Sequence, residues 1–342
     1  MWGWIRGRRT RRAPRDASAA ARAALLAVLD HDHEEAEALL SEAAKLDSSG
    51  VEPYLALARF YRMRGEIGRA IRVHQNLLLR RDLDREQTIA CIADLAADFR
   101  QGGFLQRAIA SYEEVLTWDP RHVDALRALI KLLGDVRDYP RALEMQRRLA
   151  RIENTDGSTE EARLWVDMAE AAQAEGRSGE ARRAAKRALR ANPGSVRGWL
   201  VQGALEAERG RSKAALAAWC RVPAIDRRSG ALAYPRIESA YAALDRSREF
   251  ESYLRGLLTE REDDPHARLA LGRALAARGE VEEALAELRR LLERDPENLE
   301  ARAAIGRLLL SERRDPEATK EYAELLDVLE RRGLLRTREQ LG

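Results

Sequence analysis

The chain has 342 residues, of which 45% are hydrophobic, 5% aromatic and 34% charged, and its 60 Lys and Arg against 57 Asp and Glu give a formal net charge of +3. The apolar residues are chiefly Ala and Leu, and no run of about 18 apolar residues occurs, so the sequence predicts no membrane-spanning helix. The basic N-terminus is not followed by an uncharged apolar core, so no secretory signal is predicted either. This composition is typical of helices with one apolar stripe and one solvated face.

The first 15 residues form a basic arm. Six arginines and no acid fall within it, so residues 16–342 carry 54 basic and 57 acidic side chains, a net charge of −3. We expect the arm to bind the anionic surface of a membrane, because interface-seeking rings stand beside a block of positive charge. The residues expected to make this contact are Trp2, Trp4, Arg6, Arg8 and Arg9. The alternative is a cationic tail without a membrane role. Nucleic acid is not expected as a partner, because the arm has no base-reading motif and the rest of the chain is nearly neutral.

Alanines recur through residues 16–342 at nearly fixed spacing. Eight of them are separated by 34, 38, 34, 39, 34, 69 and 34 residues: Ala36, Ala70, Ala108, Ala142, Ala181, Ala215, Ala284 and Ala318. A ninth, degenerate unit fits in the gap of 69, centred near Tyr253. Such an alanine indicates a close crossing of two helices, where a larger side chain would force them apart.

A period of 34 residues is typical of the tetratricopeptide repeat, a helix-turn-helix unit that buries its apolar face only against its neighbours. The sequence therefore predicts an all-α tetratricopeptide repeat solenoid of about nine helix pairs over residues 16–342. We expect a C-terminal capping helix that ends near Gly333. Polar segments at 80–88, 153–160 and 222–235 are predicted to be longer loops between pairs.

Catalytic and metal-binding patterns are absent from the sequence. It contains no GxxxxGK[ST], GxSxG or HExxH motif. The sequence His31-Asp32-His33 places no third metal ligand, and Cys91 and Cys220 lack metal-ligand spacing and fall on apolar helix faces. His74 is predicted to be a packed, hydrogen-bonded core residue. We therefore expect no catalytic residue, no cofactor, no metal and no enzyme activity.

A solenoid of this kind presents a concave groove lined by the first helix of each pair. In the second to fourth units the groove positions are mainly basic: Arg59, Arg62, Arg100, Arg127 and Lys131. We call these five residues the basic strip. Its expected ligand is an acidic or carboxylate-bearing protein segment. The alternative is an ordinary solvated helix face.

Two stretches are more specific than the repeat requires: Glu-Pro-Tyr-Leu-Ala-Leu at 52–57 and Met-Arg-Gly-Glu-Ile-Gly-Arg-Ala-Ile-Arg-Val-His-Gln-Asn-Leu at 63–77. Together they resemble the second repeat of the lipopolysaccharide assembly protein B family, bacterial tetratricopeptide proteins of the inner membrane. The resemblance continues through 95–115 and 125–149, and more weakly to about residue 310.

This resemblance implies a regulatory adaptor at the cytoplasmic face of the inner membrane. Family members help a membrane-bound protease degrade the deacetylase that commits precursors to lipid A, so the implied partners are such a protease and its lipid A pathway substrate. The alternative is a general tetratricopeptide scaffold that binds an unrelated acidic peptide.

The chain departs from the family pattern at both ends. Its start, Met-Trp-Gly-Trp-Ile-Arg-Gly-Arg-Arg, resembles the segment that follows the family's membrane helix, so either that helix lies upstream or the arm itself contacts the membrane. The family's C-terminal rubredoxin-like module has two CxxC pairs, whereas no cysteine follows Cys220 in this sequence.

Overall fold

A computed structural model describes residues 16–334, and every regular element in this range is a helix. The basic arm, with Trp2, Trp4, Arg6, Arg8 and Arg9, lies outside the described residues. Contacts divide the chain into two compact units, unit 1 (Met1–Leu164) and unit 2 (Trp165–Gly342), with the division inside α9. None of the described helices is long and apolar enough to cross a bilayer.

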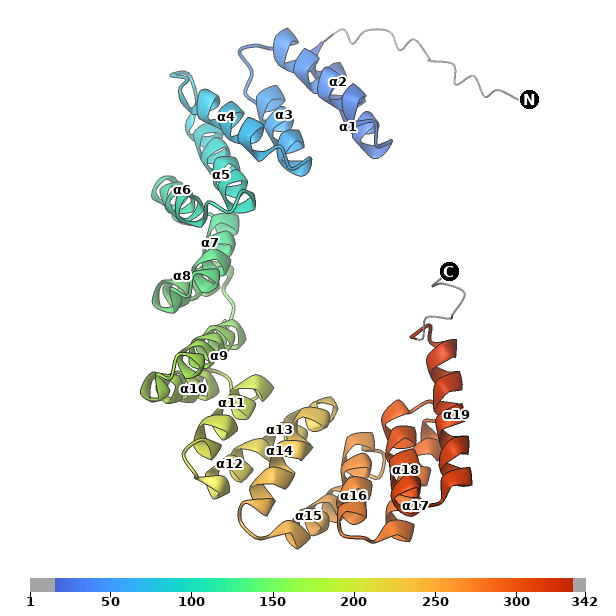
Figure 1. The fold of residues 1–342 in the computed structure, drawn as a ribbon. Coiled ribbons are helices and arrows are strands. Elements are labelled where there is room, and N and C mark those ends of the chain that lie inside the picture. Colours follow the sequence, from blue (N-terminus) through green and yellow to red (C-terminus); the bar gives the residue numbers. More distant parts are fainter. Residues whose placement is uncertain (1–15, 335–342) are drawn as a thin grey trace, which may run out of the picture. The chain divides into compact units, whose positions relative to one another are not determined.

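Unit 1 contains four complete helix pairs in which each helix from α1 to α8 contacts the next (Figure 1). They are α1 (Ala17–Leu29), α2 (His33–Leu46), α3 (Glu52–Met63), α4 (Ile67–Leu78), α5 (Arg85–Gln101), α6 (Leu105–Trp118), α7 (Val123–Asp135) and α8 (Tyr139–Glu153), followed by the first part of α9 (Ser158–Ala174).

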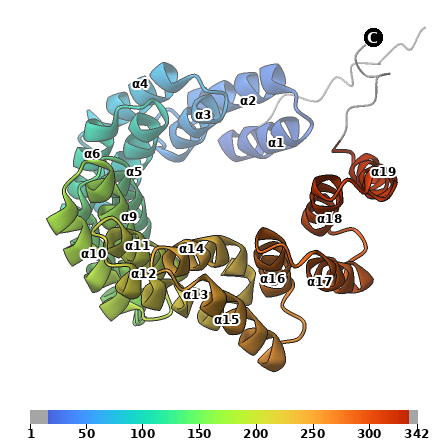
Figure 2. The ribbon, with the colours of Figure 1, turned by 60° about the horizontal axis from the view of Figure 1, so that its bottom comes forward.

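In unit 2 each helix from α10 onward contacts the next, and Figure 2 shows α16 to α19 side by side. Its further elements are α10 (Ser178–Ala191), α11 (Val196–Ala207), α12 (Ser212–Trp219), α13 (Arg221–Ile225), η1 (Arg227–Ser229), α14 (Gly230–Ala242), α15 (Ser247–Glu260), α16 (Pro265–Ala277), α17 (Val281–Arg294), α18 (Leu299–Ser311) and α19 (Asp315–Arg331).

One left-handed residue sits in the turn within each pair and shows the period directly. These residues are His31, Gly65, Gly103, Arg137, Gly176, Gly210, Asp245, Gly279 and Arg313, with φ between 56° and 79°. Five of the nine are glycines, which adopt this conformation without steric cost. The nine turns over residues 16–334 confirm the predicted all-α repeat fold and its nine pairs.

The repeated alanines lie on the second helix of eight of the nine pairs. All eight have a relative exposure of 0%. In the degenerate unit the equivalent position, 35 residues after Ala215 and 34 before Ala284, is occupied by Phe250, which is also buried and whose ring centroid lies 5.9 Å from that of Tyr241. This pair therefore keeps the turn of the repeat but fills its crossing with aromatic rings.

The predicted loops at the longer spacings are wrong over much of their length. α5 begins at Arg85 with a capping box formed by Asp84 and Gln87, and α9 begins at Ser158. Both helices have 17 residues, against 13 in α7, so most of the additional residues form one more helical turn. Between 221 and 242 the chain forms α13, η1 and α14 instead of one loop.

The end of the array also differs from the expectation. The helix that carries Ala318, α19, runs without interruption from Asp315 to Arg331, and Gly333 follows it at φ 65°. The expected capping helix is thus the second helix of the ninth pair, extended to 17 residues, and not a separate element among the described residues.

Candidate partner-binding site

The basic strip lies on the first helices of three successive pairs in unit 1. Arg59 and Arg62 are on α3, Arg100 is on α5, and Arg127 and Lys131 are on α7. The side chains of Arg59 and Arg127 are 53% and 59% exposed, whereas that of Arg62 is only 19% exposed. Arg100 and Lys131 are exposed. The five residues therefore differ in how much of their charge reaches solvent.

Arg59 and Arg62 both bind the carboxylate of Asp94 on α5. Arg59 Nε and Nη2 lie 2.8 and 2.7 Å from Asp94 Oδ2, and Arg62 Nη2 donates to Asp94 Oδ1 at 2.8 Å. Burial of Asp94 raises its pKa, but the hydrogen bonds from the two arginines outweigh burial, and the pKa lies below its ordinary value. The carboxylate is therefore held ionised between α3 and α5.

A second carboxylate carries this network into the interior. Asp98 Oδ1 accepts from Arg62 Nη1 at 2.9 Å, and Asp98 Oδ2 lies 2.6 Å from His74 Nδ1 on α4. Asp98 and His74 are both fully buried. The predicted packed, hydrogen-bonded role of His74 is confirmed. We call the five linked side chains, Arg59, Asp94, Arg62, Asp98 and His74, the interior network.

Arg59 and Arg62, the first two residues of the basic strip, also belong to the interior network, and their charges are paired there. Burial lowers the pKa of Arg62, but the hydrogen bonds to Asp94 and Asp98 outweigh it and raise that pKa above its ordinary value. Asp94 and Asp98 were missed by the sequence analysis, which described the groove positions as mainly basic. The available signal was two aspartates four residues apart in a segment otherwise rich in Ala, Ile and Leu, since a buried acid needs a cationic partner.

Arg127 makes exposed ion pairs. Its Nη2 lies 2.5 Å from Glu153 Oε1 at the end of α8, and its Nη1 lies 3.8 Å from Asp124 Oδ1. Exposed pairs of this kind contribute about 0–1 kcal/mol. A carboxylate from a partner can therefore replace Glu153 at little cost.

Arg100 and Lys131 have no ion pair among the residues that the structure describes. Tyr112 on α6 lies near Arg100: burial raises the pKa of Tyr112, and the positive charges of Arg100 and Arg62 oppose that rise. Arg127 and Lys131 stand four residues apart on α7, and Arg100 stands on α5. They are separate positive charges on the first helices of neighbouring pairs.

The remaining sequence candidates lie elsewhere. The rings of His31 and His33 are 6.4 Å apart, and the described part of the chain contains no cluster of three or more His, Cys, Asp or Glu side chains suited to a metal. Both cysteines are free. Burial raises the pKa of the Cys91 thiol to about 11, which disfavours the reactive thiolate.

Comparisons with known proteins agree with this architecture. Residues 166–228 and 251–308 match family models described as tetratricopeptide repeat. The chain is 25% identical over 288 residues to lipopolysaccharide assembly protein B of Escherichia coli K12, covering 83% of this chain and 74% of that protein. It is 30% identical over 154 residues to the Haemophilus influenzae protein of the same name, covering 45% and 38%.

Two solved structures are similar only at a low level. A crystal structure of MamA has 23% identity, covers 52% of this chain and 93% of its own, and gives a TM-score of 0.36. A tetratricopeptide repeat protein from Parabacteroides merdae has 15% identity, covers 86% and 98%, and gives 0.33. At such TM-scores these likenesses support no inference. The repeat matches, the nine turns and the sequence relatives support a definite conclusion. This chain is a tetratricopeptide repeat protein similar to lipopolysaccharide assembly protein B.

Proposed function

We propose that this chain is a non-enzymatic adaptor whose basic strip binds an acidic segment of a protein partner. The observation that carries the proposal is the state of Arg100 and Lys131, exposed cations on neighbouring first helices with no acidic partner among the described residues. Side chains in that state lose no internal interaction when a carboxylate binds them. Arg127 adds a third cation whose ion pairs are weak enough to exchange.

The two remaining strip residues have a different part in the proposal. Arg59 and Arg62 donate their hydrogen bonds to Asp94 and Asp98, so they hold α3 against α5, the helix that carries Arg100. The exposed half of Arg59 still contributes positive potential at the surface. The acidic ligand is therefore expected to be centred on α5 and α7.

We further propose that the adaptor acts in the control of lipopolysaccharide and envelope lipid synthesis, at the cytoplasmic face of the inner membrane. The sequence likeness to lipopolysaccharide assembly protein B supports this assignment. The partners would be a membrane-bound protease and its substrate in the lipid A pathway, and the arm, through Trp2, Trp4, Arg6, Arg8 and Arg9, would contact the membrane surface. The alternative is a scaffold for an unrelated acidic peptide.

The test reverses the two unpaired charges. The full chain and its Arg100→Glu/Lys131→Glu variant are used to capture proteins from native membranes, and the retained proteins are quantified by mass spectrometry. The matched control is Arg72→Glu/Lys186→Glu, which makes the same charge change at exposed, unpaired side chains on α4 and α10. Circular dichroism checks that all three are equally helical.

We expect a set of proteins that the wild type and the control retain and that the strip variant loses at least tenfold. Enrichment of a protease and a lipid A enzyme in that set would support the envelope assignment, and other proteins would favour the scaffold. Equal retention by the strip variant would show that the strip is not the binding surface.

A further inference from the structure

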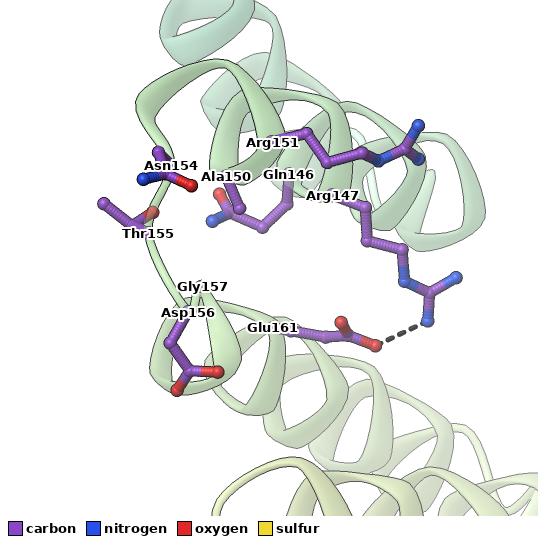
Figure 3. Close-up of a pocket in the computed structure, with 9 residues that line it drawn as sticks. All are labelled: Gln146, Arg147, Ala150, Arg151, Asn154, Thr155, Asp156, Gly157 and Glu161. Carbon is purple, nitrogen blue, oxygen red and sulfur yellow. Dashed lines mark hydrogen bonds and ion pairs between the residues drawn. The ribbon is translucent and has the colours of Figure 1, made fainter.

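A polar pocket of about 430 Å³ lies in unit 1 where α8 is joined to α9. Its volume falls within the range of roughly 300–1,000 Å³ found for ligand pockets. The pocket contains no residue of the basic strip. Its lining residues are drawn in Figure 3: Gln146, Arg147, Ala150, Arg151, Asn154, Thr155, Asp156, Gly157 and Glu161.

The connecting segment is held close to α8 by its backbone. Asn154 is left-handed, with φ 54°, and ends the helix, while Gly157 has φ 64°. A Cβ atom on Gly157 would lie 2.6 Å from Ala150 Cβ, so only glycine permits this approach. The segment therefore forms a fixed wall of the pocket.

Gln146 is the most informative residue of the pocket. It is only 7% exposed, and its amide has no hydrogen-bond partner among the described residues. The amide atoms reach the water of the pocket, where they present two donors and an acceptor. Figure 3 shows this amide on the same side of the pocket as the amide of Asn154.

The opposite side of the pocket carries positive charge. Figure 3 shows the guanidinium groups of Arg147 and Arg151 apart from each other on that side, with Arg147 directed toward Glu161. Arg147 Nη2 lies 2.5 Å from Glu161 Oε1, and Asp156 accepts a hydrogen bond from Ser158. Arg151, in contrast, has neither an ion pair nor a side-chain hydrogen bond among the described residues. The pocket therefore offers one unpaired cation and one unpaired amide that faces its water.

We propose that this pocket binds a short acidic peptide segment of a protein partner, at a site separate from the basic strip. Arg151 binds the carboxylate of the segment. The Gln146 amide donates to a backbone carbonyl and accepts from a backbone N–H, which is the pair of groups that a peptide bond supplies. An inorganic anion would pair with Arg151 but would use only the donor side of the Gln146 amide, and the wall has no large apolar side chain to hold an apolar ligand.

The test measures peptide retention by the full chain. Two random pentapeptide libraries are used, one with Glu fixed at the centre and one with Gln there. All variants are made in the Arg100→Glu/Lys131→Glu background, so that the strip does not contribute. Retained peptides are quantified by mass spectrometry for three further substitutions: Arg151→Ala, Gln146→Leu and, as the control, Arg72→Ala.

We expect the background protein and the Arg72→Ala control to retain the Glu library at least fivefold above the Gln library. Arg151→Ala should abolish this preference. Gln146→Leu, which removes the water-facing amide at similar volume, should lower retention of both libraries at least fivefold without lowering thermal stability. Since the strip is already disabled, failure of the strip proposal would not alter these results.

Three results would overturn the proposal. The first is equal retention of the two libraries by the background protein. The second is unchanged retention by both pocket variants. The third is complete displacement of the peptides by inorganic phosphate at equal concentration, because that result would assign the pocket to a simple anion.

Discussion

Asp98 is the residue whose replacement tests the interior network most directly. Asp98→Asn keeps the size of the side chain but removes its charge and turns one acceptor into a donor. Asp98 is fully buried, and its two oxygens face Arg62 Nη1 at 2.9 Å and His74 Nδ1 at 2.6 Å. The neutral amide can accept from only one of these partners, and its NH₂ group faces the other.

The size of the loss follows from the burial of the partners. Removing one member of a fully buried ion pair costs about 3–5 kcal/mol, and a hydrogen bond to a charged group contributes about 1.5–3 kcal/mol. Arg62 is 19% exposed and keeps its hydrogen bonds to Asp94. We therefore expect a local destabilisation of about 2–3 kcal/mol, below the limit for a fully buried pair.

Hydrogen exchange measured by mass spectrometry on the full chain is the suitable assay, because repeat arrays need not unfold in one step. A loss of about 2–3 kcal/mol corresponds to exchange faster by about 30- to 150-fold. We expect this acceleration in peptides from α3, α4 and α5, and none in peptides from α16 to α19. The control is Asp135→Asn, an exposed aspartate at the end of α7. If α5 exchanged as slowly in Asp98→Asn as in the control, the interior network would not contribute to local stability, and this prediction would be refuted.

Two further predictions concern pH and the arm. The folded pKa of Asp94 is below its ordinary value, so its contribution is fully present above the unfolded value of about 3.9 and is lost as pH falls through the folded value. The difference in urea midpoint between wild type and Asp94→Asn should thus be constant from pH 5 to 7 and shrink below about pH 4; an equal difference at pH 3 would contradict this. Each arginine near an anionic leaflet contributes about 1 kcal/mol. The full chain should therefore sediment with phosphatidylglycerol vesicles, dissociate at high salt and lose binding without residues 1–15, whereas a chain that stays in the supernatant at low salt would exclude the arm as an anchor.

The fold was largely predictable because single characteristic residues recur at equivalent positions of successive repeats. Ala108 and its seven equivalents identify the crossings, and Gly65 and Gly103 identify the turns. What the sequence could not show was how the longer spacings are used. A polar segment at 153–160 suits either a loop or the first turn of a helix, and the choice depends on packing within the repeat.

The candidate site was less predictable because its decisive interactions connect distant positions. Arg62 and Asp94 are 32 residues apart, and no local pattern shows that their side chains meet. Helix periodicity showed that Arg100 and Lys131 miss the core, which is why they were predicted to line the groove. Whether such an arginine is ion-paired depends on the side chains of the first helix in the following pair. The periodicity of the arginine's own helix gives no information about those side chains.

Comparison of equivalent repeat positions explains why Arg62 is paired and Arg100 is not. Both arginines stand eight residues before the crossing alanine of their unit, Ala70 and Ala108. The two carboxylates that bind Arg62 stand 14 and 10 residues before Ala108, at Asp94 and Asp98. The positions 14 and 10 residues before Ala142 carry Ala128 and Leu132. The next helix therefore offers Arg100 no acid at the places where α5 offers two to Arg62. The same repeat position is therefore ion-paired in one repeat, at Arg62, and unpaired among the described residues in the next, at Arg100. Because of this difference, we propose that an acidic partner binds the part of the strip on α5 and α7.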